Sequence, residues 1–156
     1  MRSICIIIFC VASLVVQSSN KPNIVLILID DLGLTDLQAF GGEISTPNMD
    51  ALAAEGMIFS NYHTTPECAP SRAMLLTGMD NHNTGIPMIP EVLPWKYRDT
   101  PGYEGYLRED ALTLAEMLKP AGYRTYMTGK WHLGFGGQET AAPVSYTHLT
   151  LPTTYT

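Results

Sequence analysis

Residues 23–31 read NIVLILIDD, an apolar run that is closed by two aspartates. The run is rich in β-branched side chains and lacks the polar alternation of a half-exposed strand, so it predicts a strand buried on both faces of a parallel sheet. Ligands of such sheets gather at the carboxyl ends of the strands. Asp30 and Asp31 therefore mark a candidate site at the end of the first predicted strand.

Helical and strand-like patterns alternate along the rest of the chain, around a proline-rich, irregular excursion over residues 79–108. Thr46-Pro47 has the pattern of an N-cap and first helical residue, and Thr113 with Glu116 has the spacing of a capping box. The further predicted elements are a helix over residues 46–56, a strand over 57–62, a helix over 70–77, a helix over 113–119 and a strand over 123–128. This order predicts an α/β fold that begins a doubly wound sheet.

The composition excludes several classes of protein. The chain has 15 acidic and 9 basic residues, a net charge of −6 with neutral histidines. This balance, without a cluster of Lys and Arg, argues against nucleic acid as the main partner. The 46% hydrophobic content is too high for a disordered chain, and 156 residues allow a single domain. Function must therefore be read from motifs.

Residues 1–19 have the layout of a secretory signal peptide. Arg2 supplies a positive start, an apolar run covers residues 4–16, and small residues follow at Ser18 and Ser19. A membrane-spanning helix needs about 20 apolar residues, so an uncleaved anchor is the weaker alternative. We expect a secreted or periplasmic protein that has left the membrane after cleavage. A lysosomal location is less favoured, because the chain has no Asn-x-Ser/Thr sequon.

Two motifs carry the most specific chemical information. Cleavage of the leader leaves Cys68 as the one cysteine, and a lone thiol is unusual in an exported protein. Cys68 is the first residue of the motif CAPSRAMLLTG over residues 68–78, which resembles the first signature of the type I sulfatases. The motif GYRTYMTGKWHLG over residues 122–134 resembles the second signature of this family. VLILIDDLG and GGEISTPNMDALAAEG resemble the segments that precede them in this family, in the expected order.

The resemblance extends from about Lys21 to Gly137 and implies an α/β fold, the N-terminal part of the alkaline phosphatase-like doubly wound sheet. It implies hydrolysis of sulfate esters, of the arylsulfatase type, with Cys68 oxidised to formylglycine by a formylglycine-generating enzyme. Asp30, Asp31 and the converted Cys68 would bind Ca²⁺, with Mg²⁺ as the alternative; carboxylate oxygens suit either cation. Taken alone, an Asp-Asp pair is more often a polar turn or a helix cap.

Three further residues receive catalytic roles from the resemblance. Arg72 lies one helical turn after Cys68 and would hold the hydrated aldehyde, which Lys130 would bridge to the sulfate. His132 would take a proton from the hydroxyl that does not attack sulfur. Outside these motifs, an arginine such as Arg72 is more often a solvated charge on a helix, and a lysine such as Lys130 is more often a surface residue. A histidine such as His132 is more often structural. The motif context favours the functional reading.

The end of the chain departs from the family. Residues 144–156 (VSYTHLTLPTTYT) contain five threonines and no charge and resemble no sulfatase segment. The predicted organisation is a signal peptide over 1–19, part of the catalytic domain over 20–140 and a tail over 141–156 that is an artefact rather than a genuine splice form. Since the family places two more metal ligands, a second His and a second Lys downstream, the 156 residues alone are expected to be inactive.

Two other functions stay open from the sequence. A phosphonate or phosphate ester hydrolase of the same superfamily would share the formylglycine and the metal, because both substrates are tetrahedral oxyanions. A truncated product without catalytic activity is the second alternative. The sequence assigns neither the natural substrate nor the oligomeric state.

Overall fold

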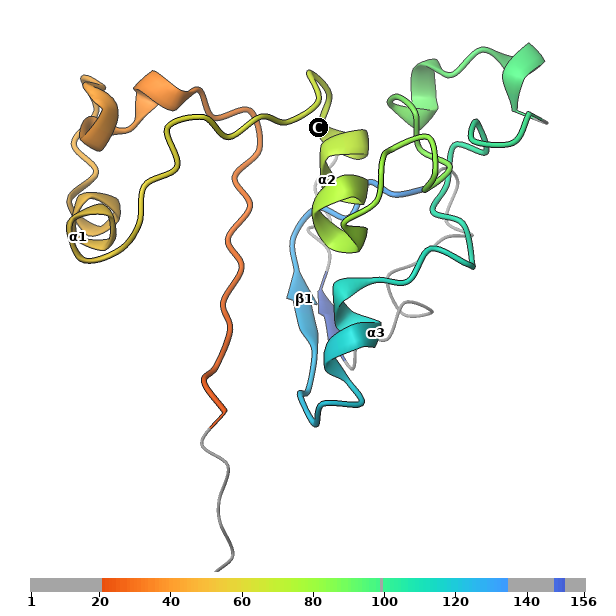
Figure 1. Cartoon of the computed structure of the whole chain (residues 1–156). Helices are drawn as coiled ribbons and strands as arrows, with labels where there is room; N and C mark the ends of the chain where they lie inside the picture. Colours follow the sequence, from red (N-terminus) through yellow and green to blue (C-terminus); the bar gives the residue numbers. More distant parts are fainter. Residues whose placement is uncertain (1–20, 99, 135–147, 151–156) are drawn as a thin grey trace, which may run out of the picture.

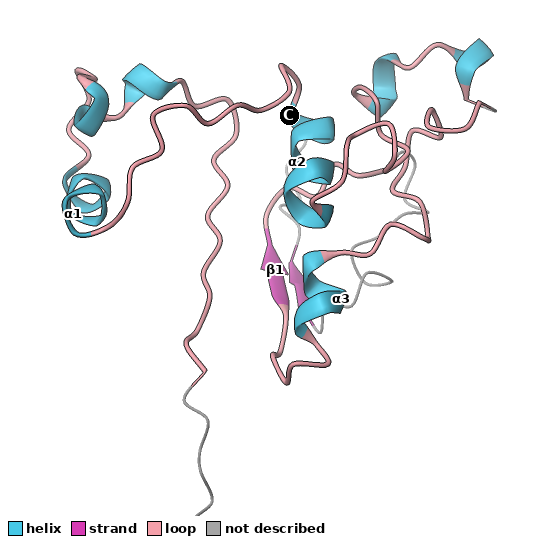
Figure 2. Cartoon of the chain, in the orientation of Figure 1, coloured by secondary structure: helices cyan, strands magenta, loops and turns pink. Residues whose placement is uncertain are grey.

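A computed structural model of the chain describes residues 21–98, 100–134 and 148–150 (Figure 1). The predicted signal peptide lies outside the described residues, and so does most of the predicted tail. Short helices and loops make up most of the described chain (Figure 2). The elements are, in chain order, the 3₁₀ helices η1 (Leu34–Asp36) and η2 (Gln38–Phe40), α1 (Pro47–Glu55), α2 (Cys68–Thr77), η3 (Pro90–Val92), η4 (Trp95–Tyr97), α3 (Leu114–Leu118), β1 (Tyr126–Thr128) and β2 (His148–Thr150).

The three predicted helices are confirmed, because their ends are set by local chemistry. Helix α1 begins at Pro47 and is followed by Gly56, as the sequence predicts. Helix α2 starts two residues earlier than predicted and ends before Gly78, whose φ of 70° is left-handed and suits glycine. At α3 the capping box forms: the backbone N–H of Thr113 donates to a carboxylate oxygen of Glu116 at 2.8 Å. None of the described helices is long and apolar enough to cross a membrane.

The strand predicted over 123–128 is confirmed in its second half. β1 pairs with β2 in parallel, with Met127 opposite Leu149. β2 lies within the stretch predicted to be a tail.

The strand predicted over 23–29 is wrong as a paired strand. This segment is extended and runs beside β1 in Figure 1, yet it forms no ladder with any described residue. A cavity of about 600 Å³ separates the two, lined by Ile24 and Leu28 on one side and by Tyr126 and Thr128 on the other. A strand requires a neighbour within about 5 Å to pair its N–H and C=O groups, and this segment pairs with none of the described residues. The strand predicted over 57–62 is likewise wrong: it is loop and turn, and Phe59 is exposed.

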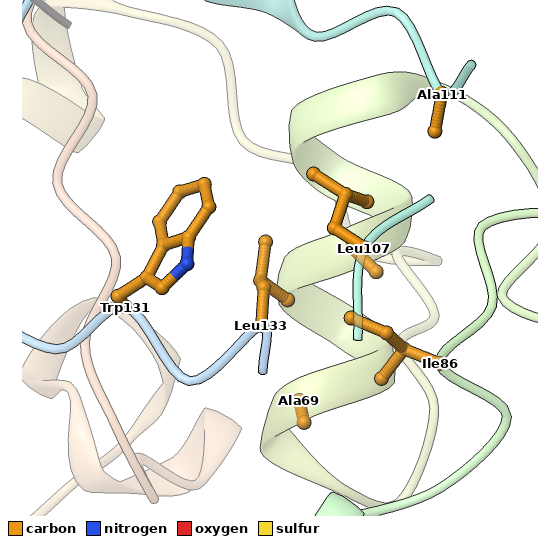
Figure 3. Close-up of a cluster of buried hydrophobic side chains, with 7 residues drawn as sticks. Ala69, Ile86, Leu107, Ala111, Trp131 and Leu133 are labelled. Atoms are coloured by element: carbon orange, nitrogen blue, oxygen red, sulfur yellow. The ribbon is translucent and has the colours of Figure 1, made fainter. Parts of the chain in front are cut away.

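The hydrophobic core gathers around α2. Its buried members come from α2, the excursion, the short stretch between the excursion and α3, and the segment after β1 (Figure 3): Ala69, Ala73, Ile86, Leu107, Ala111, Trp131 and Leu133. Alanines on the buried face of α2 let the other segments approach the helix closely. This packing fixes both the first turn of α2 and residues 130–133, the two places where the sequence predicts reactive side chains.

Candidate active site

Cys68 is the first residue of α2 and is half-buried. Residue Glu67 precedes it in an extended conformation, so the chain turns into the helix immediately before the sulfur. The N-terminal end of a helix carries partial positive charge and unpaired N–H groups. A negatively charged group at position 68 is therefore electrostatically favoured.

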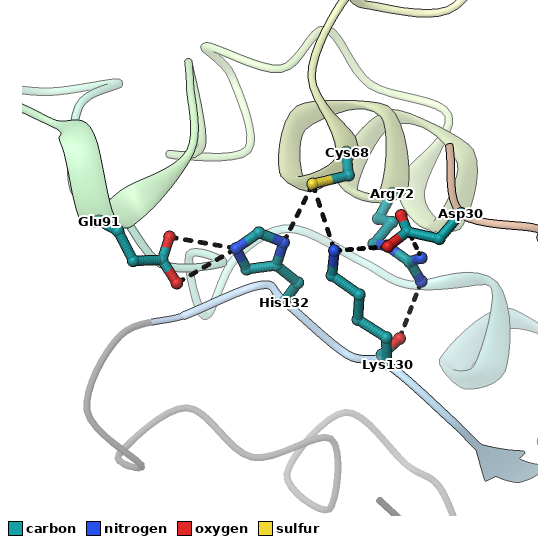
Figure 4. A network of polar contacts seen from close by, with 6 residues as sticks. All are labelled: Asp30, Cys68, Arg72, Glu91, Lys130 and His132. Atoms are coloured by element: carbon teal, nitrogen blue, oxygen red, sulfur yellow. Dashed lines mark hydrogen bonds and ion pairs between the residues drawn. The ribbon is translucent and has the colours of Figure 1, made fainter. Parts of the chain in front are cut away.

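Lys130 and His132 reach Cys68 from the segment that follows β1. Residues on this segment alternate between two environments: Trp131 and Leu133 are buried in the core, while Lys130 and His132 turn toward the sulfur (Figures 3 and 4). Lys130 Nζ lies 3.4 Å and His132 Nδ1 lies 3.3 Å from Cys68 Sγ. Two nitrogens of different chemistry thus converge on one atom.

Asp30 and Arg72 complete the cluster. The Arg72 side chain is 9% exposed, and its guanidinium donates to Asp30 at 3.2 Å and to the carbonyl oxygen of Lys130 at 2.8 Å. The Lys130 ammonium donates to the other carboxylate oxygen of Asp30 at 2.8 Å. Arg72 therefore fixes both the end of the extended segment and the loop after β1.

These contacts hold Asp30 and Lys130 in their charged forms. The hydrogen bond from Lys130 lowers the pKa of Asp30, aided by Arg72 and opposed by partial burial. Partial burial works against the charge of Lys130, but its hydrogen bonds to Asp30 and Cys68 outweigh this and raise the pKa of Lys130. The site at neutral pH therefore presents a carboxylate and two cations next to residue 68.

Two site residues have unusual backbone. Among the described non-glycine residues, only Asp31 (φ 56°) and His132 (φ 57°) have left-handed conformations. Such conformations cost energy and persist where the surrounding structure holds them, often at functional sites. Both were singled out by the sequence for other reasons.

The described residues provide only part of a metal site. Asp30 and Asp31 supply the oxygen ligands that Ca²⁺ and Mg²⁺ prefer, but Asp30 is already paired with two cations. No cluster of three or more His, Cys, Asp or Glu side chains with the geometry to hold a metal occurs in the described part of the chain. Two carboxylates fall short of the roughly 6–8 oxygens that Ca²⁺ takes.

The structure thus brings together five of the six residues that the sequence selected: Asp30, Cys68, Arg72, Lys130 and His132 (Figure 4). Asp31 follows Asp30 but is exposed and makes no hydrogen bond or ion pair to the other described residues. Glu91 was missed. Its carboxylate contacts His132 Nε2, but it lies in the irregular excursion, where no motif or periodicity distinguishes it from a surface acid.

Comparison with known proteins places this chain among the sulfatases. A sequence profile of the family described as Sulfatase matches residues 22–156. An arylsulfatase of Klebsiella aerogenes is 48% identical over 119 residues, which cover 74% of this chain and 25% of the relative. Arylsulfatase A of Homo sapiens is 44% identical over 127 residues, covering 80% of this chain and 24% of the relative.

Solved structures agree with the sequence comparison. The crystal structure of Ps i-CgsB superimposes with a TM-score of 0.68 at 37% identity, covering 82% of this chain and 27% of that one. The chain belongs to the sulfatase family, a family of sulfuric ester hydrolases, and has the N-terminal part of its alkaline phosphatase-like α/β fold. It spans about a quarter of the length of the relatives it matches.

Proposed function

We propose that the protein containing this chain hydrolyses sulfate esters to an alcohol and inorganic sulfate, in the manner of an arylsulfatase. The observation that carries the proposal is the convergence of Lys130 Nζ and His132 Nδ1 on Cys68 Sγ, 62 and 64 residues away in the sequence. Family membership supports the reaction class, and the surrounding cations suit an anionic substrate.

The nucleophile in this proposal is formylglycine, made from Cys68 by a formylglycine-generating enzyme. The position fits such a group, because a proton acceptor and a cation both lie within 3.5 Å of the atom that would be replaced. Hydrated formylglycine supplies two hydroxyls on one carbon, one to attack sulfur and one whose deprotonation restores the aldehyde and releases sulfate.

The chain's own residues then have separable tasks. His132 Nδ1 would accept a proton at residue 68. Lys130 Nζ would place positive charge between residue 68 and the sulfate oxygens. Arg72 would hold Asp30 and the backbone of Lys130 in position, so that both point at the reacting centre.

Asp30, Asp31 and residue 68 would hold a divalent cation, Ca²⁺ in preference to Mg²⁺, together with ligands beyond the described residues. When bound, the cation would offset the charge of the sulfate oxygens. Each carboxylate oxygen of Asp30 accepts one hydrogen bond, from Arg72 or from Lys130, and keeps a further lone pair that could bind the metal. We further propose export to the periplasm or the extracellular space, through the signal-like residues 1–19.

The test compares matched aryl sulfate and aryl phosphate substrates with the natural gene product that contains this sequence. The proposal predicts a higher kcat/KM for the sulfate, whereas a phosphate or phosphonate ester hydrolase would show the reverse order. Cys68→Ala should lower kcat by about 10³-fold or more, the scale on which loss of a covalent nucleophile acts.

His132→Ala should also lower kcat, whereas His63→Ala serves as its matched control. His63 is exposed, its Nε2 lies 2.8 Å from Asn61 Oδ1, and it lies outside the cluster around Cys68. Sulfate hydrolysis that survives in Cys68→Ala at the wild-type rate would refute the assignment of the nucleophile.

A further inference from the structure

Glu91 faces His132 on the side of the ring opposite Cys68. The two carboxylate oxygens of Glu91 lie 3.2 and 3.1 Å from His132 Nε2, and His132 Nδ1 lies 3.3 Å from Cys68 Sγ. Figure 4 shows the imidazole between the carboxylate and the sulfur. The His132 side chain is 14% exposed, so it has few other partners for its nitrogens.

The contact decides which nitrogen carries the proton. An ionised carboxylate can only accept hydrogen bonds, so the nitrogen that faces it must be the N–H donor. With the proton of neutral His132 on Nε2, the lone pair of Nδ1 points toward residue 68. The opposite tautomer would place two acceptors, Nε2 and the carboxylate, against each other.

The backbone that carries Glu91 is fastened to the site. The N–H of Ile89 donates at 2.6 Å to the side chain of Glu67, the residue immediately before Cys68. Pro90 and Leu93, on either side of Glu91, are buried, and the Arg98 guanidinium donates to the carbonyl oxygen of Pro90 at 3.0 Å. Glu91 is therefore presented by an anchored turn although its own side chain is 49% exposed.

We propose that Glu91 is a positioning residue for catalysis: it holds the ring of His132 and keeps Nδ1 as the proton acceptor toward residue 68. The role of Nδ1 as an acceptor rests on the proposed function; the contact and the tautomer do not. The excursion over residues 79–108 thereby contributes to the active site through a residue outside both signatures.

Two readouts test the proposal on the natural gene product. The first is ¹⁵N NMR of histidine-labelled protein above the titration range of histidine, with the His132 signals assigned by their loss in His132→Asn. Wild type should show a protonated Nε2 and an unprotonated Nδ1, whereas Glu91→Ala should show averaging of the two tautomers. The second is aryl sulfate kinetics, in which Glu91→Ala should lower kcat by about 10–100-fold with KM within about twofold, as for other partners that orient a functional histidine.

The variant Glu91→Gln tests whether the charge of Glu91, and not only its packing, orients His132. Glutamine keeps the shape but can donate to a bare Nε2 as readily as it accepts from Nε2–H, so kcat should also fall by about tenfold or more. A wild-type kcat in Glu91→Gln would overturn the proposal. Glu109→Ala is the matched control: this exposed glutamate lies outside the site and should leave both readouts unchanged.

The outcomes distinguish this proposal from the proposed function. If wild type fails to hydrolyse aryl sulfate, the proposed function is lost and the NMR comparison alone decides the role of Glu91. If wild type is active, both readouts must change in Glu91→Ala; an unchanged His132 spectrum or an unchanged kcat overturns the proposal. Equal thermal midpoints of wild type and variants show that neither change reflects unfolding.

Discussion

Two apolar regions of this molecule differ in burial: the core around α2, and the region made of residues 24–29 and α1. Around α2, the side chains of Ala69, Ile86 and Leu133 are fully buried against one another (Figure 3). In the segment over 24–29 the apolar side chains are 43–80% exposed, and α1 has no buried residue. Figure 1 shows α1 on one side of the extended run and the core around α2 on the other. Hydrophobic sequence alone therefore does not produce a core; the segments need partners within packing distance.

The polar contacts of the site link these two regions. Asp30 ends the exposed run, and its carboxylate is held by Arg72 from α2 and by Lys130 from the segment after β1. The position of Asp30 in the candidate site thus depends mainly on charge pairing. The position of Cys68 depends mainly on the packing of the core. The following experiments measure that difference.

Truncation in the core should have the largest effect. Leu133 is fully buried beside His132, and Leu133→Ala should lower the free energy of unfolding by about 2–5 kcal/mol through lost burial and an unfilled cavity. Chemical denaturation of wild type and variant measures it. A change below about 0.5 kcal/mol, typical of surface positions, would contradict the assignment of this region as the core.

The start of α3 should show an intermediate effect. The Thr113 side chain accepts a hydrogen bond from the backbone N–H of Glu116 at 3.3 Å and is fully buried. Thr113→Ala should lower the free energy of unfolding by about 1 kcal/mol, the usual cost of losing an N-cap. Thr113→Ser keeps the hydroxyl and should recover most of that loss. If serine is no better than alanine, packing and not capping explains the loss.

Removing the charge of Asp30 should cost less. The Asp30 side chain is 38% exposed, so Asp30→Asn should lower the free energy of unfolding by only about 0.2–1 kcal/mol, and less at high salt. Because folding lowers the pKa of Asp30, its contribution is fully present above the unfolded value of about 3.9 and is lost as pH falls through the folded pKa.

Denaturation of wild type and Asp30→Asn across this acid range measures the pH dependence. The two curves should converge at the acid end, and a gap that widens on acidification would contradict the direction of the pKa shift.

Truncation in the exposed run should have the smallest effect. Val25 is 80% exposed, so Val25→Ala should change the free energy of unfolding by no more than about 0.5 kcal/mol. Denaturation alongside Leu133→Ala gives the contrast directly. A loss comparable with that of Leu133→Ala would mean that the run is buried in solution, and the distinction between the two regions would fail.

The sequence predicts the ends of the helices well, because neighbouring residues determine them. The ends of α1, α2 and α3 follow from Pro47, Gly78 and the pair Thr113–Glu116, all of which act within one turn of the chain. Strands depend on partners that are distant in sequence, so the apolar pattern over 23–29 predicts a strand that finds no partner among the described residues.

The residues of the candidate site differ in the same way. Asp30 and Lys130 each lie just past a segment predicted to be a strand, over 23–29 and 123–128, and the structure brings them together although only residues 126–128 form a strand. Cys68, Lys130 and His132 were selected by motif, and their roles stay predictions. Glu91 could not be selected, because its contact with His132 depends on how an irregular excursion folds back, which no local pattern encodes.

Mass spectrometry of the peptide that contains residue 68, from the natural gene product after export, tests the identity of the nucleophile. In the proposed function, Cys68, with Lys130 and His132 around it, is the precursor of the nucleophile. The exported protein should contain formylglycine, an aldehyde in place of the thiol. If only the intact thiol is found, the assignment of the nucleophile is contradicted.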